Sequence, residues 1–413
     1  MRIGIVDGFS TARFLVEELR RRGASCIHIR SQKNPPKVYA RAFKAAAYTY
    51  DLGWSSAVLQ ETATKLAELS VDRVVAGTES GVVLADQLNH LLELPGNRIA
   101  LAHARRVKAA MARALRAAGL ATAEDISAAT PQEAVAWFTS RSERPVVVKP
   151  QSSAGTDNVR ICRTATEVAA ACQAVLDEPN FFGEPNRTAL VQEYLDGEEY
   201  YVNTVSLGGV HKVAEIWRSV RRTGPDGAPL YDYQEPVPVD DPVAVAAAPY
   251  IKDVLTALGI ANGAAHSELR VTERGPVLLE TGARLGGGVL PRISRDYAGV
   301  SHVHLLADSL TDPDAFDAFD DTAVTWSKNI RYVSLISHHP GTAAAATWQD
   351  TMRSLTTFDG LISRISAGGA VPRTIDLASS PGVVYLVADS AGPVEDDYAH
   401  IRTLERDKGL YLS

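Results

Sequence analysis

The first 98 residues alternate short apolar runs with segments whose apolar residues recur at helical spacing. The runs RIGIVD, CIHIR and DRVVAG have the length and composition of buried strands. The helical patterns lie near residues 10–22, 55–69 and 80–92. This alternation predicts a small parallel α/β unit of Rossmann-like shape over residues 1–98. The first turn, after Asp7 and Gly8, lacks the G-x-G-x-x-G spacing, so dinucleotide binding is not indicated.

The middle of the chain combines helical and strand patterns in a different order. Residues 100–120 carry apolar side chains at helical spacing and reach Gly119, where a helix C-cap belongs. PVVVKP, at 145–150, and VRIC then predict two short strands joined by the small polar loop QSSAGTDN. A helix with a capping box formed by Thr164 and Glu167 follows. This strand, loop and strand order predicts a hairpin flap.

The second half of the chain is predicted to contain mainly strands. ALVQEYLDGEEYYVNTVSL and VHKVAEIWRSV indicate strands, with a hairpin turn at Gly208 and Gly209. The stretch 221–242 is rich in Pro and Gly and predicts a long functional loop or a plain surface excursion. A helix is expected over 243–258. SKNIRYVSLISHHPG and GVVYLVADS indicate strands and the tail begins as a helix, so we expect a C-terminal α/β appendage over 326–413.

The stretch GAAHSELRVTERGPVLLETGARLGGG predicts a hairpin with a turn around Arg274. Glu268 and Glu280 are equally distant from Arg274, so a hairpin centred there places the two carboxylates opposite each other. Period-2 alternation assigns one face to His266, Glu268, Arg270, Leu278 and Glu280. It assigns the apolar face to Ala265, Leu269, Val271, Val277 and Leu279.

Opposed carboxylates about 5 Å apart destabilise a strand pair unless a cation lies between them. Oxygen ligands without cysteine favour Mg²⁺ or Mn²⁺ over zinc, and Mg²⁺ usually takes water and phosphate oxygens as its other ligands. Glu268 and Glu280 are therefore predicted metal ligands. The alternatives are a surface pair neutralised by Arg270 or Arg284, and a strand register that differs by one residue.

Length, charge and cysteine content narrow the class of protein. A chain of 413 residues suggests two or three domains, and a net charge of -7 argues against broad binding to nucleic acid or an anionic membrane. Cys26, Cys162 and Cys172 lack the paired spacing of a disulfide framework or zinc site, which fits a reducing cytoplasm. No segment approaches the roughly 18 apolar residues of a membrane span, and no export signal is visible.

Lysine is scarce, with ten residues against 32 arginines, so general abundance does not explain a lysine inside an apolar segment. Lys108 lies on or beside the apolar stripe of its helix, where a lysine that extends from the stripe to solvent is the ordinary alternative. Lys149 ends the strand before the flap. Ser152, Ser153, Gly155 and Thr156 give that flap small side chains and exposed N–H groups that suit a triphosphate or, alternatively, a surface turn.

The order of these features resembles the ATP-grasp superfamily over residues 1 to about 310. The resemblance is strongest to carboxylate–amine ligases that couple amino acids, including bacterial L-amino-acid ligases that make dipeptides. It implies an α/β protein of ATP-grasp fold. The implied domains are a Rossmann-like pre-grasp domain (1–98), two α+β subdomains that enclose ATP (99–187 and 188–325) and the C-terminal α/β appendage (326–413).

The resemblance also assigns residues to roles. Lys108 and Lys149 would contact the nucleotide phosphates, the flap would cover them, and Glu199 in GEEY would take the ribose hydroxyls. The hinge strand would offer backbone groups to adenine from Gln192 to Leu195, which includes Glu193 and Tyr194. Glu268 and Glu280 match the magnesium ligands of the family.

Two further residues match the pattern of the family, and one position departs from it. Arg284 matches an arginine that holds a substrate carboxylate or phosphorylated intermediate, and His266 matches a histidine of the same pocket. Gly282 replaces an Asn that serves many members as a further metal ligand, which leaves the number of metal ions open. Fork-shaped guanidinium groups suit carboxylates, so one of the arginines just before or at the start of the Pro- and Gly-rich stretch is expected to bind a second carboxylate. These are Arg218, Arg221 and Arg222.

The resemblance implies a cytoplasmic ligase that uses ATP and Mg²⁺ or Mn²⁺ to form an amide bond through an acyl phosphate. We expect amino-acid or small carboxylic-acid substrates, no nucleic acid and no membrane, and the resemblance is compatible with a homodimer. One rival function is a carboxylase of the same superfamily that uses bicarbonate. Another is a catalytically silent nucleotide-binding protein, against which the presence of both Glu268 and Glu280 argues.

Overall fold

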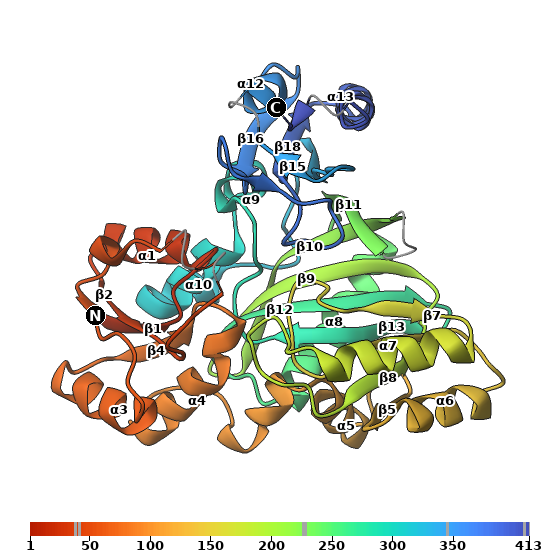
Figure 1. Cartoon of the computed structure of the whole chain (residues 1–413). Helices are drawn as coiled ribbons and strands as arrows, with labels where there is room; N and C mark the ends of the chain where they lie inside the picture. The colour runs from red at the N-terminus through yellow and green to blue at the C-terminus, as the bar shows by residue number, and fades with distance from the viewer. Residues whose placement is uncertain (37–38, 40–42, 225–228, 344–346, 408–409, 413) are drawn as a thin grey trace.

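The computed structural model describes residues 1–36, 39, 43–224, 229–343, 347–407 and 410–412. The chain forms an N-terminal α/β unit, a small sheet with two helices, and a large sheet that continues into the C-terminal part (Figure 1). In this described part of the chain, no helix is long and apolar enough to cross a lipid bilayer.

The N-terminal unit is a parallel sheet in the order β3-β2-β1-β4, as the alternating pattern predicts. Its elements are β1 (Arg2–Val6), α1 (Ala12–Arg21), β2 (Ser25–Ile29), η1 (Ala45–Ala47), β3 (Tyr50–Asp51), α3 (Val58–Glu68), β4 (Arg73–Ala76), η2 (Glu79–Gly81) and α4 (Val82–Leu91). Ile3 and Ile5 share a buried cluster with residues of α1, whereas Val6 and Ile27 share one with residues of α3 and α4. Helices therefore cover both faces of the sheet, which suits a parallel arrangement.

The second unit contains the predicted hairpin flap. Its elements are η3 (Ile99–Leu101), η4 (His103–Arg105), α5 (Lys108–Ala117), β5 (Asp125–Ala128), α6 (Pro131–Ser140), β6 (Val146–Pro150), β7 (Arg160–Cys162), α7 (Ala165–Asp177) and β8 (Ala189–Glu193). β6 and β7 pair antiparallel on either side of the flap, residues 151–158, and the capping box of Thr164 and Glu167 starts α7. The small sheet has the order β5-β8-β6-β7, and α6 and α7 pack against it.

The helix expected from residue 100 starts only at Lys108, so the prediction was wrong for its first two turns. These turns are the short 3-10 segments η3 and η4. The reason lies in Arg105, which is fully buried, pairs with Asp86 at 2.6 Å and donates to the carbonyls of Arg98 and Leu258. Tertiary contacts of one buried guanidinium thus override the local helical pattern.

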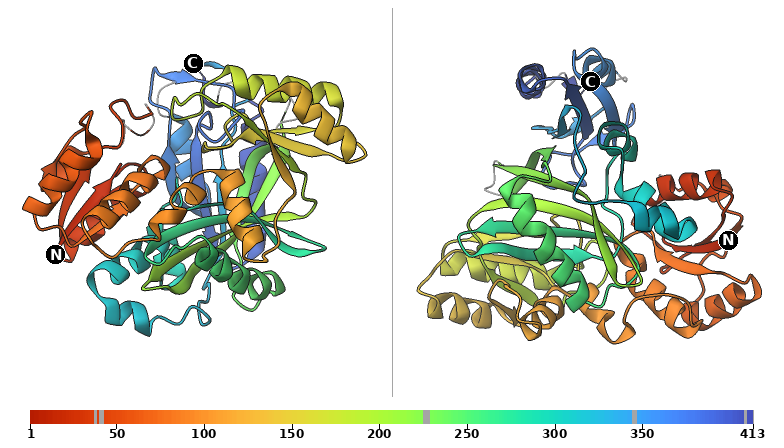
Figure 2. Two further views of the ribbon diagram at one scale, coloured as in Figure 1. Left: turned by 90° about the horizontal axis from the view of Figure 1, so that it is seen from below. Right: turned by 180° about the vertical axis from the view of Figure 1, so that it is seen from behind.

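The large sheet has the order β13-β12-β9-β10-β11-β14-β18-β16. Its elements and connections are β9 (Glu198–Leu207), β10 (Val210–Thr223), β11 (Pro229–Pro236), α8 (Pro242–Ala257), β12 (Gly263–Thr272), β13 (Gly275–Gly282), α9 (Pro291–Ala298), α10 (His302–Thr311), α11 (Pro313–Ala318), β14 (Asn329–Ser334), β15 (Gly341–Thr342), α12 (Thr347–Arg353), β16 (Phe358–Ser363), β17 (Ala370–Val371), β18 (Gly382–Ala388) and α13 (Ala391–Leu404). Figure 2 shows α8 across the back of the sheet, where it packs against β9, β10 and β12. α10 packs against α1 and so joins the sheet to the N-terminal unit.

The stretch 221–242 is not a long loop, contrary to the prediction. Within its described residues β11 pairs with both β10 and β14 inside the sheet, while residues 225–228 lie outside the described part. The buried positions of β11 alternate, but two of them are polar: Asp232 contacts Arg402, and Gln234 accepts a hydrogen bond from Tyr201. The sequence alone does not identify these distant partners, so the two polar residues obscure the period-2 pattern of a buried strand.

The hairpin β12–β13 brings Glu268 opposite Glu280, as predicted, but by a different route. Thr272 pairs with Gly275, so the turn holds two residues and is not centred on Arg274, and a bulge beyond Glu268 restores the predicted pairing. The bulge reverses three assignments of the period-2 pattern, those of Val277, Leu278 and Leu279. Val277 pairs with Arg270 and packs with Leu195. Leu278 packs in the core beside α8, and Leu279 lines a cavity together with Glu280.

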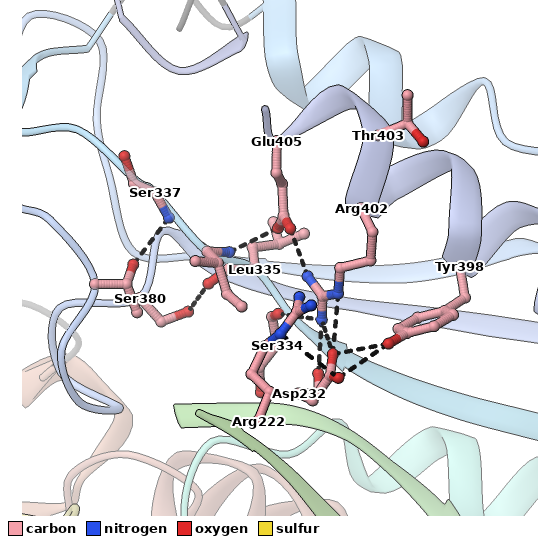
Figure 3. A network of polar contacts seen from close by, with 12 residues as sticks. Arg222, Asp232, Ser334, Leu335, Ser337, Ser380, Tyr398, Arg402, Thr403 and Glu405 are labelled. Carbon is pink, nitrogen blue, oxygen red and sulfur yellow. Dashed lines mark hydrogen bonds and ion pairs between the residues drawn. The ribbon is translucent and has the colours of Figure 1, made fainter. Parts of the chain in front are cut away.

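A buried polar network ties α13 to the large sheet (Figure 3). Arg402 donates to Asp232 of β11, to Glu405 and to the carbonyl of Ser334, and Tyr398 donates to Asp232 at 3.0 Å. Burial opposes the charge of Arg402, yet the carboxylates of Glu405 and Asp232 raise its pKa. The network therefore holds a charged guanidinium inside the protein only because two carboxylates accompany it.

Asp232→Asn, which removes one of those carboxylates at nearly constant volume, should lower the free energy of unfolding by about 3 kcal/mol, because a buried guanidinium loses part of its compensation. Urea unfolding followed by circular dichroism measures the change. The matched control is Arg222→Ala, since Arg222 is more exposed and lies 3.9 Å from Asp232; it should cost less than about 1 kcal/mol. Equal losses in the two variants would contradict this account.

Candidate active site

Two adjacent cavities meet at the predicted metal ligands. The first, the flap cavity, has a volume of about 940 Å³ and lies between the flap, the hinge after β8 and the hairpin β12–β13. The second cavity, of about 1470 Å³, is lined by the N-terminal unit, the same hairpin and the C-terminal part. Both are lined by Ala154, Gly155, Asp157, Glu199, Arg221, Tyr231, Glu268 and Glu280. A molecule in one cavity can thus approach a molecule in the other beside the carboxylate pair, Glu268 and Glu280.

The structure brings nearly all predicted site residues to these cavities. The flap cavity is lined by Lys108, Lys149, Ser153, Gly155, Thr156, Glu193, Tyr194, Leu195, Glu199, Glu268 and Glu280. His266 and Arg284 line the second cavity. Ser152 lines neither cavity: its carbonyl accepts a hydrogen bond from Asn180 and thereby anchors the flap.

The two predicted lysines converge from different elements. Lys149 is buried at the end of β6, and Lys108 is the first residue of α5, with its Nζ atom 2.6 Å from Glu280 Oε2. Lys108 therefore points into the cavity instead of extending along the helix to solvent. Burial lowers the pKa of Lys149 to about 8, and the charge of Lys108 acts in the same direction against the nearby carboxylates. Two close cations in a small cavity form a site for a polyanion.

The carboxylate pair is surrounded by positive groups. Burial alone would raise the pKa of Glu268, but His266, Arg221 and Arg284 hold it well below its usual range, so the carboxylate is ionised. His266 Nε2 lies 3.5 Å from Glu268 Oε1, and its other ring nitrogen lies 2.7 Å from Asn203 Oδ1. His266 is thus oriented toward Glu268 by a neighbouring amide.

The donor set suits a hard cation with few protein ligands. Within the described residues, no group of three or more His, Cys, Asp and Glu side chains gathers as a metal cluster. Two opposed carboxylates would then supply the protein ligands, and phosphate and water oxygens the rest. Mg²⁺ is bound in this manner in many phosphate-handling sites. The residues present therefore fit Mg²⁺.

The remaining polar residues of the flap cavity are engaged with one another. Glu199 pairs with Arg221 and, at 3.6 Å, with Arg270, and Arg270 donates to the carbonyl of Leu195. The carboxylate of Glu193 pairs with arginines, so any contact of this residue with adenine would use its backbone. The apolar wall includes Val147, Ile161, Leu195 and Leu279. Leu279 reaches this wall because of the bulge that the sequence did not reveal.

Of the three arginines expected to bind a second carboxylate, Arg221 alone lines the cavities. Arg218 pairs with Glu198 and Glu235. Arg222 lies 3.9 Å from Asp232, outside both cavities.

Glu79 is a site residue that the sequence reasoning did not identify. It is buried in η2 and pairs with Arg284 at 3.1 Å and with Arg106 at 3.6 Å. A Cβ atom on Gly282 would lie 2.6 Å from Glu79 Oε2, so the missing side chain at 282 makes room for this carboxylate. The available signal was the run GTESG directly after a parallel strand, because ligands bind beyond the carboxyl ends of such strands.

Several buried polar atoms of the second cavity have no hydrogen-bond partner among the described residues. They are Thr11 Oγ1, Ser219 Oγ and Arg221 Nη1. Buried polar groups are nearly always paired in proteins, so such orphans point to a missing partner. These groups are therefore available for hydrogen bonds with water or with a polar ligand in the second cavity.

Comparisons with known proteins agree with this geometry. The sequence profile of the ATP-grasp domain matches residues 142–292. Dapdiamide A synthase of Enterobacter agglomerans is 32% identical over 411 residues, which cover 98% of this chain and 96% of the relative. The L-amino acid ligase from Bacillus licheniformis has a TM-score of 0.76 at 19% identity and 97% coverage of each chain. A carboxyaminoimidazole ribonucleotide synthase from Aspergillus clavatus complexed with ATP has a TM-score of 0.70 at 14% identity and 98% coverage of each chain, so both solved structures share the fold.

The lowered pKa of Lys149 gives a testable pH dependence of ADP binding. Below a pH of about 8 Lys149 is charged and attracts phosphate; above it, ADP must bind together with a proton. The affinity for ADP should therefore fall as the pH rises from 7.5 to 9.5, by at most about tenfold per pH unit. Isothermal titration calorimetry in two buffers of different ionisation enthalpy measures both affinity and proton uptake. Lys149→Arg should abolish the uptake; unchanged uptake in this variant would assign the proton to another group.

Proposed function

The chain belongs to the ATP-grasp ligases, and we propose that it uses ATP to form an amide bond between an amino acid or small carboxylic acid and an amino acid. The observation that carries this proposal is the meeting of two cavities at Glu268 and Glu280. One cavity has the cationic, flap-covered character of a nucleotide site. The other is polar, larger, and holds Arg284 beside the same carboxylates. The relationship to dapdiamide A synthase over nearly the whole chain supports the same assignment.

In the first step an oxygen of the substrate carboxylate attacks the γ-phosphorus of ATP. An oxygen–phosphorus bond forms, the bond between that phosphorus and ADP breaks, and the carboxylate becomes an acyl phosphate. Lys108 and Lys149 would neutralise the charge on the transferring oxygens, and the planar fork of Arg284 would hold the carboxylate. The flap would exclude water, which otherwise hydrolyses the acyl phosphate.

In the second step the amine nitrogen of the other substrate attacks the acyl carbon. The carbon–oxygen bond to phosphate breaks, phosphate leaves with that oxygen, and the nitrogen loses a proton as the amide forms. The reaction needs chiefly positioning and charge neutralisation by the enzyme. We assign His266 the role of orienting Glu268, and Glu79 that of orienting Arg284.

Glu268 and Glu280 would hold Mg²⁺, which supplies positive charge to the phosphate oxygens of bound ATP. Lys108 pairs with Glu280 in the present structure. Binding of nucleotide with its cation would offer phosphate to Lys108 in place of that carboxylate. We also propose a cytoplasmic enzyme whose substrates are small molecules; the homodimer that the family resemblance allows is tested by sedimentation.

A substrate-pool assay tests the proposed function. The enzyme is incubated with ATP, Mg²⁺, the proteinogenic L-amino acids and a set of small mono- and dicarboxylic acids, with and without bicarbonate. We expect ADP and phosphate release that depends on the pool, and a product whose mass is the sum of two pool members minus water. Release that depends on bicarbonate and not on the pool would identify a carboxylase. Absence of release and of ATP binding would contradict the ligase assignment.

Glu280→Gln tests the metal site. It keeps the side chain's size but removes a charged ligand, so turnover in the pool assay should fall roughly 100- to 1000-fold. Excess Mg²⁺ should restore part of that loss. The matched control is Glu273→Gln, in the exposed turn of the same hairpin, which should keep wild-type turnover. Normal activity of the Glu280→Gln variant would show that Glu280 is not a metal ligand.

A further inference from the structure

The second cavity extends beyond the residues that serve the acyl transfer. Part of its wall comes from the C-terminal part of the chain: Tyr332, Arg364, Asp376, Leu377 and Ala378. None of these residues lines the flap cavity. A ligand in this portion of the second cavity would therefore lie against residues that do not line the flap cavity.

Arg364 is the residue of this wall whose charge is not compensated by the protein. Arg284 pairs with Glu79, and Arg221 pairs with Glu199. Among the described residues, no carboxylate forms an ion pair with Arg364, whose side chain is half-buried. Its Nη1 atom donates to the carbonyl of Leu377 at 3.1 Å, and its side chain also contacts the hydroxyl of Tyr332; these neutral groups hold the guanidinium but do not neutralise it.

Asp376 is the acidic residue among these five, and its contacts are with Ser379. The carboxylate of Asp376 accepts hydrogen bonds from the N–H and hydroxyl of Ser379, at 2.7 and 2.6 Å. Arg364 thus keeps donors for a ligand. A partly buried guanidinium that faces a cavity and has no carboxylate paired with it among the described residues is a natural binding group for a ligand carboxylate, because its fork matches the two oxygens.

Gly288 lies beside Arg364 in the wall of the cavity that Arg284 also lines. A Cβ atom at Gly288 would lie 3.3 Å from Arg364 Nη2 and 3.6 Å from the hydroxyl of Tyr332, so glycine leaves space for both groups. Gly288 follows Arg284 by four residues. Because an extended chain spans at most about 3.5 Å per residue, the Cα atoms of Arg284 and Gly288 are at most about 14 Å apart. Arg284 and Arg364 therefore line one cavity at the scale of a small substrate pair.

We propose that Arg364 binds the free carboxylate of the amine substrate and so makes the enzyme select amino acids as amine donors. This inference rests on the proposed function. An amino acid that attacks through its nitrogen keeps its own carboxylate throughout the reaction, and the product carries it too. Arg284 is assigned to the carboxylate that reacts, and Arg221 is paired with Glu199, so the uncompensated cation of the cavity is the group left for the carboxylate that does not react.

Arg364→Gln tests the assignment with two series of amine donors that are matched in size. The proteinogenic L-amino acids serve as amine donors in one series and their carboxamides, which lack the negative charge, in the other. The acid partner, found in the substrate-pool assay, is present in both. Wild-type enzyme should prefer the amino acid that it couples over its carboxamide. Arg364→Gln should raise KM for that amino acid roughly 10- to 100-fold, the loss expected for a charge-assisted hydrogen-bonded pair.

Three comparisons separate recognition from damage to the fold. KM for the carboxamide and kcat should change by less than about threefold in Arg364→Gln, and Arg364→Lys should recover part of the preference for the amino acid because it keeps the charge. Arg353→Gln is the matched control, since Arg353 is exposed on α12; it should leave every constant unchanged. These expectations concern KM, which a purely structural role for Arg364 would not shift selectively.

Each contrary result has one meaning. An unchanged preference for the amino acid over its carboxamide in Arg364→Gln overturns the assignment while the ligase function stands. A raised KM for the acid partner, with the amine's KM unaffected, also overturns it and places the acid at Arg364. Absence of any coupled product from wild-type enzyme contradicts the proposed function, and the assignment falls with it.

Discussion

Two carboxylates placed opposite each other on neighbouring strands are the constraint on which the site depends. Glu268 and Glu280 would repel each other if nothing positive were near, and cations from separate elements offset this repulsion. Lys108 comes from the start of α5, Arg221 from β10 and Arg284 from the chain after β13. We propose that the same cations bind the triphosphate and a substrate carboxylate, so the arrangement that stabilises the hairpin would also favour phosphoryl transfer.

The position of this pair explains why the chain needs several units. The flap closes one cavity over the carboxylates, and the N-terminal unit contributes Glu79 to the other. The large sheet continues through β14, β18 and β16, which brings Arg364 to the far wall. Gly282 and Gly288 lack side chains where Glu79 and Arg364 approach. Substrate selection is thereby placed on parts of the chain that do not touch the nucleotide.

The sequence predicted much of this arrangement because its signals are local. The parallel N-terminal unit, the flap hairpin and the facing carboxylates follow from alternation, turn residues and spacing. The incorrect or missing predictions concern residues whose partners are distant in the sequence. β11 was hidden because Asp232 and Gln234 occupy buried positions that Arg402 and Tyr201 satisfy. Leu278 and Leu279 exchanged roles because of a bulge. Glu79 and Arg364 reach the site through tertiary contacts that no nearby pattern indicates.

The central claim, that a substrate carboxylate is phosphorylated before the amine attacks, is tested most directly by the fate of its oxygen. Acid substrates with carboxylates labelled by ¹⁸O are supplied with ATP, Mg²⁺ and the amine, and the released phosphate is analysed by mass spectrometry. The account predicts one ¹⁸O atom in each phosphate, because the attacking oxygen leaves with phosphorus. Phosphate without ¹⁸O, released together with coupled product, would contradict an acyl-phosphate route.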